Sequence, residues 1–248
     1  LIADYFRRRG LSPKVHVHLF TPEPQPMPVA GPQLGEAVRS MLEAKRIEFR
    51  PLHRLSSVDP VSRELVFENG QRFNYDLLVA VPPHRAPKAV VAGGLTNQTG
   101  WIPVDPQTMR TGQNGVYAIG DVTAIPIPGR WKPDVPLMLP KAGVFAHAQA
   151  EVVAQRIVAE IAGRPCRATF CGDGYCMLEA GEDLAGFAFG NFFAEPAPRV
   201  QLRQIGKAWH LGKVLFEKWW LAPVGIRRSL IGRILMAGGR IYGIPVAL

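Results

Sequence analysis

The sequence has few cysteines and no long apolar run. Its 248 residues contain no eighteen consecutive apolar positions, so no transmembrane helix is predicted. The three cysteines, Cys166, Cys171 and Cys176, follow one another at intervals of five, which does not match the closer ligand pairs of zinc sites. His16 and His18 share one face of a predicted strand, but no third ligand lies nearby in the sequence, so no metal site is expected.

The glycine pattern GxGxxG is also missing. The only glycine before Gly31 is Gly10, so the chain lacks the loop that seats a pyrophosphate on a helix N-terminus. The first residue is Leu1 rather than Met. We therefore expect this chain to be the C-terminal part of a longer protein.

Acidic residues are scarce, above all near the C-terminus. The whole chain has 29 basic and 20 acidic residues, a net charge of +9. From Lys207 onward Glu217 is the only acidic residue, whereas seven positions are basic: Lys207, Lys213, Lys218, Arg227, Arg228, Arg233 and Arg240. This basic C-terminal segment also contains Trp209, Trp219 and Trp220, a mixture that favours a membrane surface over a nucleic-acid groove.

Two interpretations of this segment stay open. In the first, a helix directs apolar side chains into lipid, namely Leu230, Ile231, Ile234 and Leu235. In the second, the helix covers a hydrophobic groove of its own protein and its arginines are solvated. Several glycines weaken any long continuous helix here, at positions Gly225, Gly232, Gly238 and Gly239.

A short apolar run at 116–119 is bounded by Gly115 and Gly120, which predicts a strand buried on both faces of a parallel sheet. Ligands of open α/β sheets bind beyond the carboxyl ends of their strands. Asp121 should project into such a crevice, where its carboxylate can accept hydrogen bonds from sugar-like hydroxyls.

A helix is predicted from Leu139 to about residue 161, because apolar residues recur at helical spacing at Val144, Phe145, Ala148, Val152, Ile157 and Ile161. Pro140 stands at its start and Gly163 just past its end. Its N-terminal amides and Lys141 should face the Asp121 crevice, where their positive potential would stabilise an anionic ring. The alternative is that Asp121 caps a turn and Lys141 is solvated.

Other elements follow from simpler patterns. A helix end is expected at 3–9, a strand at 14–20, an amphipathic helix at 34–47, a hairpin turning at Asn69 and Gly70, and a buried strand ending at Pro82.

Together these landmarks resemble a known family. TGQNGVYAIGD at 111–121 is similar to the second flavin motif of the two-dinucleotide-binding-domain flavoproteins. The order of LIADYFRRRG, YDLLVAVPPHRAP, GWIPVD, VYAIGDVT, PKAGVFAHAQAEVVA and GDGYCMLEAG narrows the resemblance to the sulfide:quinone oxidoreductase-like branch. The resemblance implies an α/β chain with an N-terminally truncated, Rossmann-like FAD/NAD(P)-binding fold and a smaller C-terminal α+β unit.

The resemblance also implies a division of the chain and a cofactor site. Residues 1–83 would end the second dinucleotide-binding-type domain, 84–163 would end the FAD-binding domain, and 164–248 would form a quinone- and membrane-facing domain. The cofactor would be FAD, contacted by Gly120, Asp121, Pro140, Lys141, Ala142 and Gly143.

Cys176 matches the second redox cysteine of this branch, whereas Cys166 and Cys171 match nothing and are interpreted as structural. The implied chemistry is sulfide attack on an electrophilic sulfur, with two electrons passing through flavin to quinone. A buried, inert thiol is the alternative for Cys176. The first cysteine of the pair would precede Leu1.

The leading hypothesis is thus a flavin-dependent sulfide:quinone oxidoreductase, peripheral on the cytoplasmic membrane face, with sulfide, quinone and the membrane as partners and no nucleic acid. A type II NADH:quinone dehydrogenase of the same fold is the alternative. From another class, the chain would be a non-catalytic membrane-binding piece. This piece alone is expected to be inactive and to hold no FAD.

Overall fold

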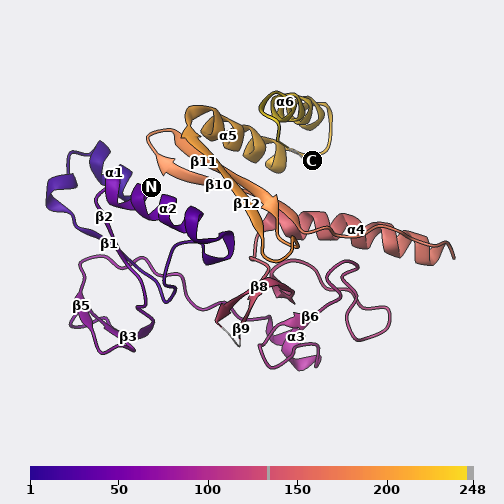
Figure 1. Cartoon of the computed structure of the whole chain (residues 1–248), viewed down its shortest axis with the longest axis horizontal. Helices are drawn as coiled ribbons and strands as arrows, with labels where there is room; N and C mark the ends of the chain where they lie inside the picture. The colour runs from indigo at the N-terminus through magenta and orange to yellow at the C-terminus, as the bar shows by residue number, and fades with distance from the viewer. Residues whose placement is uncertain (133–134, 245–248) are drawn as a thin grey trace. The chain divides into compact units, whose positions relative to one another are not determined.

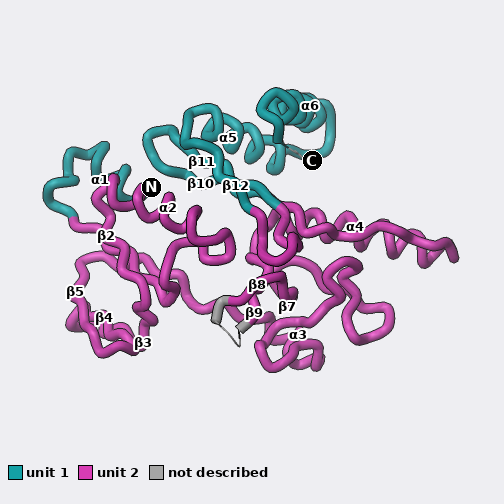
Figure 2. Tube along the Cα trace, in the orientation of Figure 1, with its two compact units in different colours: residues 1–15, 175–190, 200–248 teal, residues 16–174, 191–199 magenta. Residues whose placement is uncertain are grey.

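A computed structural model describes residues 1–132 and 135–244 (Figure 1). The chain forms two compact units, distinguished by colour in Figure 2. Unit 1 comprises residues 1–15, 175–190 and the chain from Val200 onward, and unit 2 comprises residues 16–174 and 191–199. Each unit is therefore built from segments that are distant in the sequence.

Unit 2 begins with a strand–helix–strand segment. β1 (Val17–Phe20) pairs in parallel with β2 (Ile47–Arg50), and α2 (Pro32–Ala44) connects them. A connection between parallel strands requires such a crossover helix. The predicted strand at 14–20 and the helix at 34–47 are both confirmed, although each is shorter than expected.

A three-stranded antiparallel sheet follows, formed by β3 (Leu55–Asp59), β4 (Glu64–Phe67) and β5 (Arg72–Asn74). The predicted hairpin turn is confirmed between β4 and β5, where Gly70 has a φ of 81°. Phe20 of β1 packs on Phe67 and Phe73 of this sheet, with ring centroids 4.8 and 4.9 Å apart.

The predicted buried strand before Pro82 is wrong. Leu77, Val79 and Val81 are 67%, 66% and 82% exposed, and no strand is assigned between residues 75 and 82. A strand buried on both faces needs hydrogen-bonded neighbours and covering layers, and the described chain provides neither for this segment.

The remainder of unit 2 surrounds a hydrophobic core made of Met109, Ile125, Phe145, Val152 and Phe170. The short β6 (Ile102–Pro103) pairs in parallel with β7 (Thr123–Ala124), and β8 (Pro126–Lys132) forms an antiparallel hairpin with β9 (Val135–Met138). α3 (Lys88–Ala92) precedes β6.

The run 116–119 is not the parallel strand that the pattern predicts. Within the part of the chain that the structure describes, its one ladder contact is an antiparallel bridge between Arg110 and Tyr117. Ala118 is nevertheless buried, so the apolar pattern identifies a buried segment but not its pairing.

The predicted long helix is present as α4 (Gly143–Ile161), and Gly163 follows its end with a φ of 61°. Phe145 and Val152 are buried, whereas Ile157 and Ile161 are exposed. Only the N-terminal half of the apolar stripe is therefore covered.

Most of unit 1 is a sheet with two helices. β10 (Asp173–Gly181), β11 (Leu184–Asn191) and β12 (Arg199–Gly206) lie in that order, followed by α5 (Lys207–Leu221) and α6 (Ile226–Tyr242). Phe187 of the sheet stacks on Trp209 of α5 at 5.3 Å, and Trp209 contacts Tyr242 of α6 at 5.1 Å. This is the smaller α+β unit that was expected. None of the described helices is both long and apolar enough to cross a bilayer.

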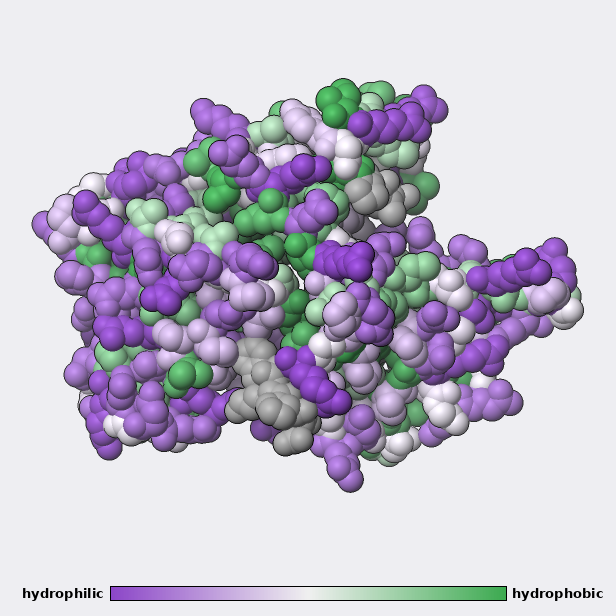
Figure 3. Space-filling view, in the orientation of Figure 1, coloured by the Kyte–Doolittle hydropathy of each residue, from purple (hydrophilic) through white to green (hydrophobic). Residues whose placement is uncertain are grey.

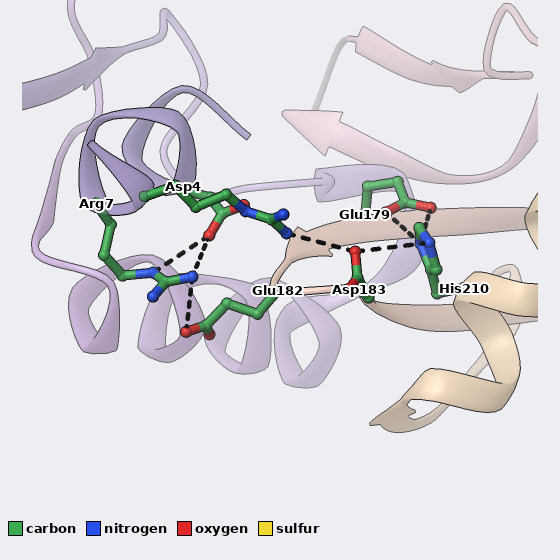
Figure 4. A network of polar contacts seen from close by, with 7 residues as sticks. Asp4, Arg7, Glu179, Glu182, Asp183 and His210 are labelled. Carbon is green, nitrogen blue, oxygen red and sulfur yellow. Dashed lines mark hydrogen bonds and ion pairs between the residues drawn. The ribbon is translucent and has the colours of Figure 1, made fainter. Parts of the chain in front are cut away.

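The first helix, α1 (Ile2–Arg8), is held to the β10–β11 turn of unit 1 by charged side chains (Figure 4). Asp4 binds Arg7 at 2.7 Å and Arg8 at 2.8 Å. These arginines reach Glu182 at 3.3 Å and Asp183 at 3.4 Å, respectively. The hydrogen bond from Arg7, followed by that from Arg8, lowers the pKa of Asp4 to about 2 although desolvation opposes the shift.

Replacing Asp4 should reduce the acid sensitivity of unit 1. Because the pKa of Asp4 is depressed in the folded chain, its stabilisation is present above its ordinary value of 3.8 and is lost as pH falls towards 2. Asp4→Asn should therefore have a lower melting temperature than wild type at pH 7. Between pH 4 and pH 2 its melting temperature should fall less than that of wild type. Circular dichroism melts measure this, with exposed Asp76→Asn as the control. An unchanged pH slope in Asp4→Asn would refute the assignment.

Candidate functional site

The candidate site is built on a tight turn, η3 (Gly120–Val122), that lies against α4. Gly120 has a φ of 69°, and a Cβ atom there would lie 3.0 Å from the Cβ of Ala146. A side chain at this position would be strained in its backbone and crowded against the helix. The glycine therefore allows the turn to approach α4 closely.

A buried glutamine fixes this approach. The Gly120 amide donates a 2.6 Å hydrogen bond to Oε1 of Gln149, which is only 1% exposed. Sequence reasoning missed Gln149, although a signal was present. It lies four residues after Phe145 and three before Val152, which places a polar side chain on the buried face of the helix.

Asp121 and Lys141 are brought together at this turn, as predicted. Lys141 Nζ donates a hydrogen bond to the Asp121 carbonyl, lies 3.5 Å from the Thr123 carbonyl, and sits 3.4 Å from the ring centroid of Trp101. Desolvation lowers the pKa of Lys141, and the nearby Asp121 charge partly opposes this effect. Lys141 is thus held by specific partners, and Trp101 is a contact that sequence reasoning missed.

The Asp121 carboxylate itself is exposed, and in the described part of the chain it accepts no hydrogen bond. The turn η3 has no side-chain cap. In the described chain the Asp121 side chain therefore does not cap η3.

The N-terminus of α4 is similarly available. The helix begins at Gly143, without a side-chain cap and without an acidic residue in its first turn. Pro140, Lys141 and Ala142 precede it, because Ala142 has extended backbone angles of −150° and 142°. A Cβ atom at Gly143 would meet no atom within 4 Å. The helix end and Lys141 thus supply positive potential beside an exposed carboxylate.

Cys176 belongs to β10 in unit 1, whereas Asp121 and Lys141 belong to unit 2. All three cysteines are free in the described chain. Neighbouring atoms partly remove the Cys176 thiol from water, and this desolvation raises its pKa. The thiol is therefore mostly protonated at neutral pH, which makes it a weak nucleophile in this state.

Removing the Gln149 amide should destabilise the chain. Gln149→Leu leaves the partly buried Gly120 amide without its acceptor, and we expect a loss of about 1–3 kcal/mol in unfolding free energy. Urea unfolding followed by circular dichroism measures this loss. The matched control is Gln155→Leu, an exposed position of the same helix, which should change stability by less than about 0.5 kcal/mol. Equal losses in both variants would contradict the role of this hydrogen bond.

Comparison with known proteins places these features in context. The chain is 35% identical over 109 residues to a sulfide-quinone reductase of Aquifex aeolicus, covering 44% of this chain and 24% of that protein. It is 26% identical over 129 residues to the mitochondrial sulfide:quinone oxidoreductase of Mus musculus, covering 49% of this chain and 28% of that protein. The chain thus spans about a quarter of each of these curated relatives.

A solved structure matches a larger part of the fold. The sulfide:quinone oxidoreductase of Aquifex aeolicus superposes with a TM-score of 0.76 at 24% identity, covering 89% of this chain and 52% of that one. A family model for pyridine nucleotide-disulphide oxidoreductases matches residues 2–155, which is more than half of the chain. The Rossmann-like α/β fold class predicted from the sequence is confirmed, and the chain belongs to the pyridine nucleotide-disulphide oxidoreductase family.

Proposed function

We propose that this chain is part of a flavin-dependent enzyme that oxidises sulfide and passes the electrons to a quinone. The observation that carries the proposal is the exposed, unbonded Asp121 carboxylate beside Lys141 and the uncapped N-terminus of α4. Family membership supports it, as do two relatives whose names describe sulfide and quinone chemistry.

The residues at this turn fit FAD. Asp121 would accept hydrogen bonds from the ribityl hydroxyls, and Gly120 would let the backbone approach the ligand. The amide of Gly143 and the charge of Lys141 would lie towards the ring, with Pro140 and Ala142 shaping the approach. Bound flavin would supply two-electron acceptor chemistry. Since the chain has no GxGxxG loop, contacts to the pyrophosphate would come from residues outside it.

Cys176 would carry sulfur. Its raised pKa makes the free thiol a poor attacking group, so we assign it to the electrophilic side of the reaction. In a disulfide with a second cysteine of the longer protein, the sulfur of Cys176 would accept attack by hydrosulfide. A persulfide would form and the partner thiolate would leave, which balances both atoms and electrons.

The basic C-terminal segment would face the membrane, on the cytoplasmic side. Leu221, Val224 and Ile226 at the α5–α6 turn are strongly exposed, as is Leu230 of α6. Figure 3 shows hydrophobic and hydrophilic residues side by side over α6 at the top of the view. Exposed aliphatics beside cations suit the boundary between lipid and water. The three-part division at 83 and 163 stays a prediction for the longer protein.

The flavin site is tested in the full-length protein. Purified wild type should show flavin absorbance, and Asp121→Ala should bind FAD roughly 10- to 100-fold more weakly, because hydrogen bonds to a charged group contribute about 1.5–3 kcal/mol. Cofactor content after gel filtration measures this, with Asp76→Ala as the control. A colourless full-length protein, or full retention of FAD by Asp121→Ala, would contradict the flavin assignment.

The sulfur chemistry is tested separately. Cys176→Ser should abolish sulfide-dependent reduction of decylubiquinone, followed optically, while FAD content stays at the wild-type level. Cys171→Ser, the matched exposed thiol, should remain near wild type. Survival of activity in Cys176→Ser, together with NADH-dependent quinone reduction, would instead identify a type II NADH:quinone dehydrogenase. Vesicle binding without flavin or turnover would identify a non-catalytic membrane module.

A further inference from the structure

Unit 1 contains an apolar cavity of about 220 Å³ between its sheet and the two C-terminal helices. Tyr175 and Phe187 line it from the sheet, Trp209 and Phe216 from α5, and Leu235 from α6. The indole N–H of Trp209 is already bonded to the Gln204 carbonyl at 2.8 Å. Burial raises the pKa of Tyr175 to about 12. Among the described residues that line this cavity, the tyrosines are the only ionisable ones, so it suits hydrocarbon.

Glycines create much of this space. Gly212 of α5 and Gly238 and Gly239 of α6 line the cavity. A Cβ atom added at Gly212 or Gly238 would meet no atom within 4 Å. Protein interiors are close-packed, and an apolar void of about 150 Å³ is already large enough to take a benzene-sized guest. The helices therefore leave open a space that alanine, a better helix former, would begin to fill.

The cavity reaches solvent where Leu211, Ile234 and Tyr242 line it, since these three side chains are also 59%, 49% and 51% exposed. Two lysines lie on the same side of α5 as Leu211. Lys207 precedes Leu211 by four residues and Lys218 follows it by seven, and both spacings keep a side chain on one face of a helix. Within the described chain neither lysine has an ion-pair partner.

We propose that this cavity binds one acyl chain of an anionic membrane lipid, with the headgroup outside near Lys207 and Lys218. The apolar lining selects the hydrocarbon chain. The charge of α5 and α6, with Glu217 as their only acid, selects a negative headgroup. The proposal deepens the membrane association proposed above and does not depend on flavin binding.

Calorimetric titration of the 248-residue chain tests the proposal, with sodium dodecanoate, decanoate and octanoate below their micelle concentrations. Dodecanoate should bind at one site, and each methylene removed should weaken binding about fourfold, which corresponds to about 0.8 kcal/mol. Dodecyltrimethylammonium, with the same chain and a positive headgroup, should bind at least several-fold more weakly. Equal affinity for both headgroups, or no dependence on chain length, would overturn the proposal.

Filling the cavity provides the second test. Gly238→Leu should weaken dodecanoate binding at least tenfold, whereas Ala237→Leu, an exposed neighbour outside the lining, should leave it unchanged. If circular dichroism shows that Gly238→Leu is unfolded, Gly212→Ala and Gly238→Ala replace it, with a graded loss expected. Equal binding by the filling and control variants, or tighter binding of decylubiquinone than of dodecanoate, would overturn the acyl-chain assignment.

Vesicles separate this proposal from the membrane association. Wild type that binds dodecanoate but not vesicles of anionic phospholipid would refute the membrane lipid as the occupant. Vesicle binding that weakens in Gly238→Leu but not in Ala237→Leu would support it. Neither result bears on FAD content or sulfide turnover, so failure here is distinguishable from failure of the flavin chemistry.

Discussion

The candidate site depends on one hydrogen bond, from the Gly120 amide to the buried side chain of Gln149. It joins an irregular turn to the helix α4, and the Gln149 side chain that accepts it is shielded from water. Because the turn is held there, the carboxylate of Asp121 is displayed beside the start of α4. The same arrangement brings the Lys141 ammonium group to the Asp121 carbonyl. The geometry of the candidate site is thus set by a contact within the protein itself.

Sequence reasoning identified Asp121 and Lys141, which we propose contact the cofactor, but it missed the residues that hold them in place. Asp121 and Lys141 were predicted because motif order and spacing placed them together. Gln149 and Trp101 were missed, since their partners lie 29 and 40 positions away and no local pattern specifies such contacts. The apolar pattern located the segments 77–81 and 116–119 but did not predict their strand pairing, and it predicted burial correctly only for the second. Strand formation requires a neighbour, which a single sequence segment does not specify.

The helices were predicted more reliably, because their hydrogen bonds are local. α2 and α4 follow the spacing of apolar residues; Pro32 stands at the start of α2, and Gly163 follows the end of α4. The grouping of α1 with residues 175–190 could not be predicted, since it depends on ion pairs between segments about 175 residues apart. Charged residues at helix ends are common, and nothing local shows which ones will meet.

The β10–β11 turn has a consequence for the order of folding. Both of its central residues, Glu182 and Asp183, adopt left-handed backbone angles, with φ of 59° and 57°, that non-glycine residues rarely take. Their side chains meet the arginines of α1, which the ribosome makes far earlier. During vectorial synthesis α1 therefore lacks its partners Glu182 and Asp183 until this hairpin is made, while the nearly continuous unit 2 can acquire its contacts first.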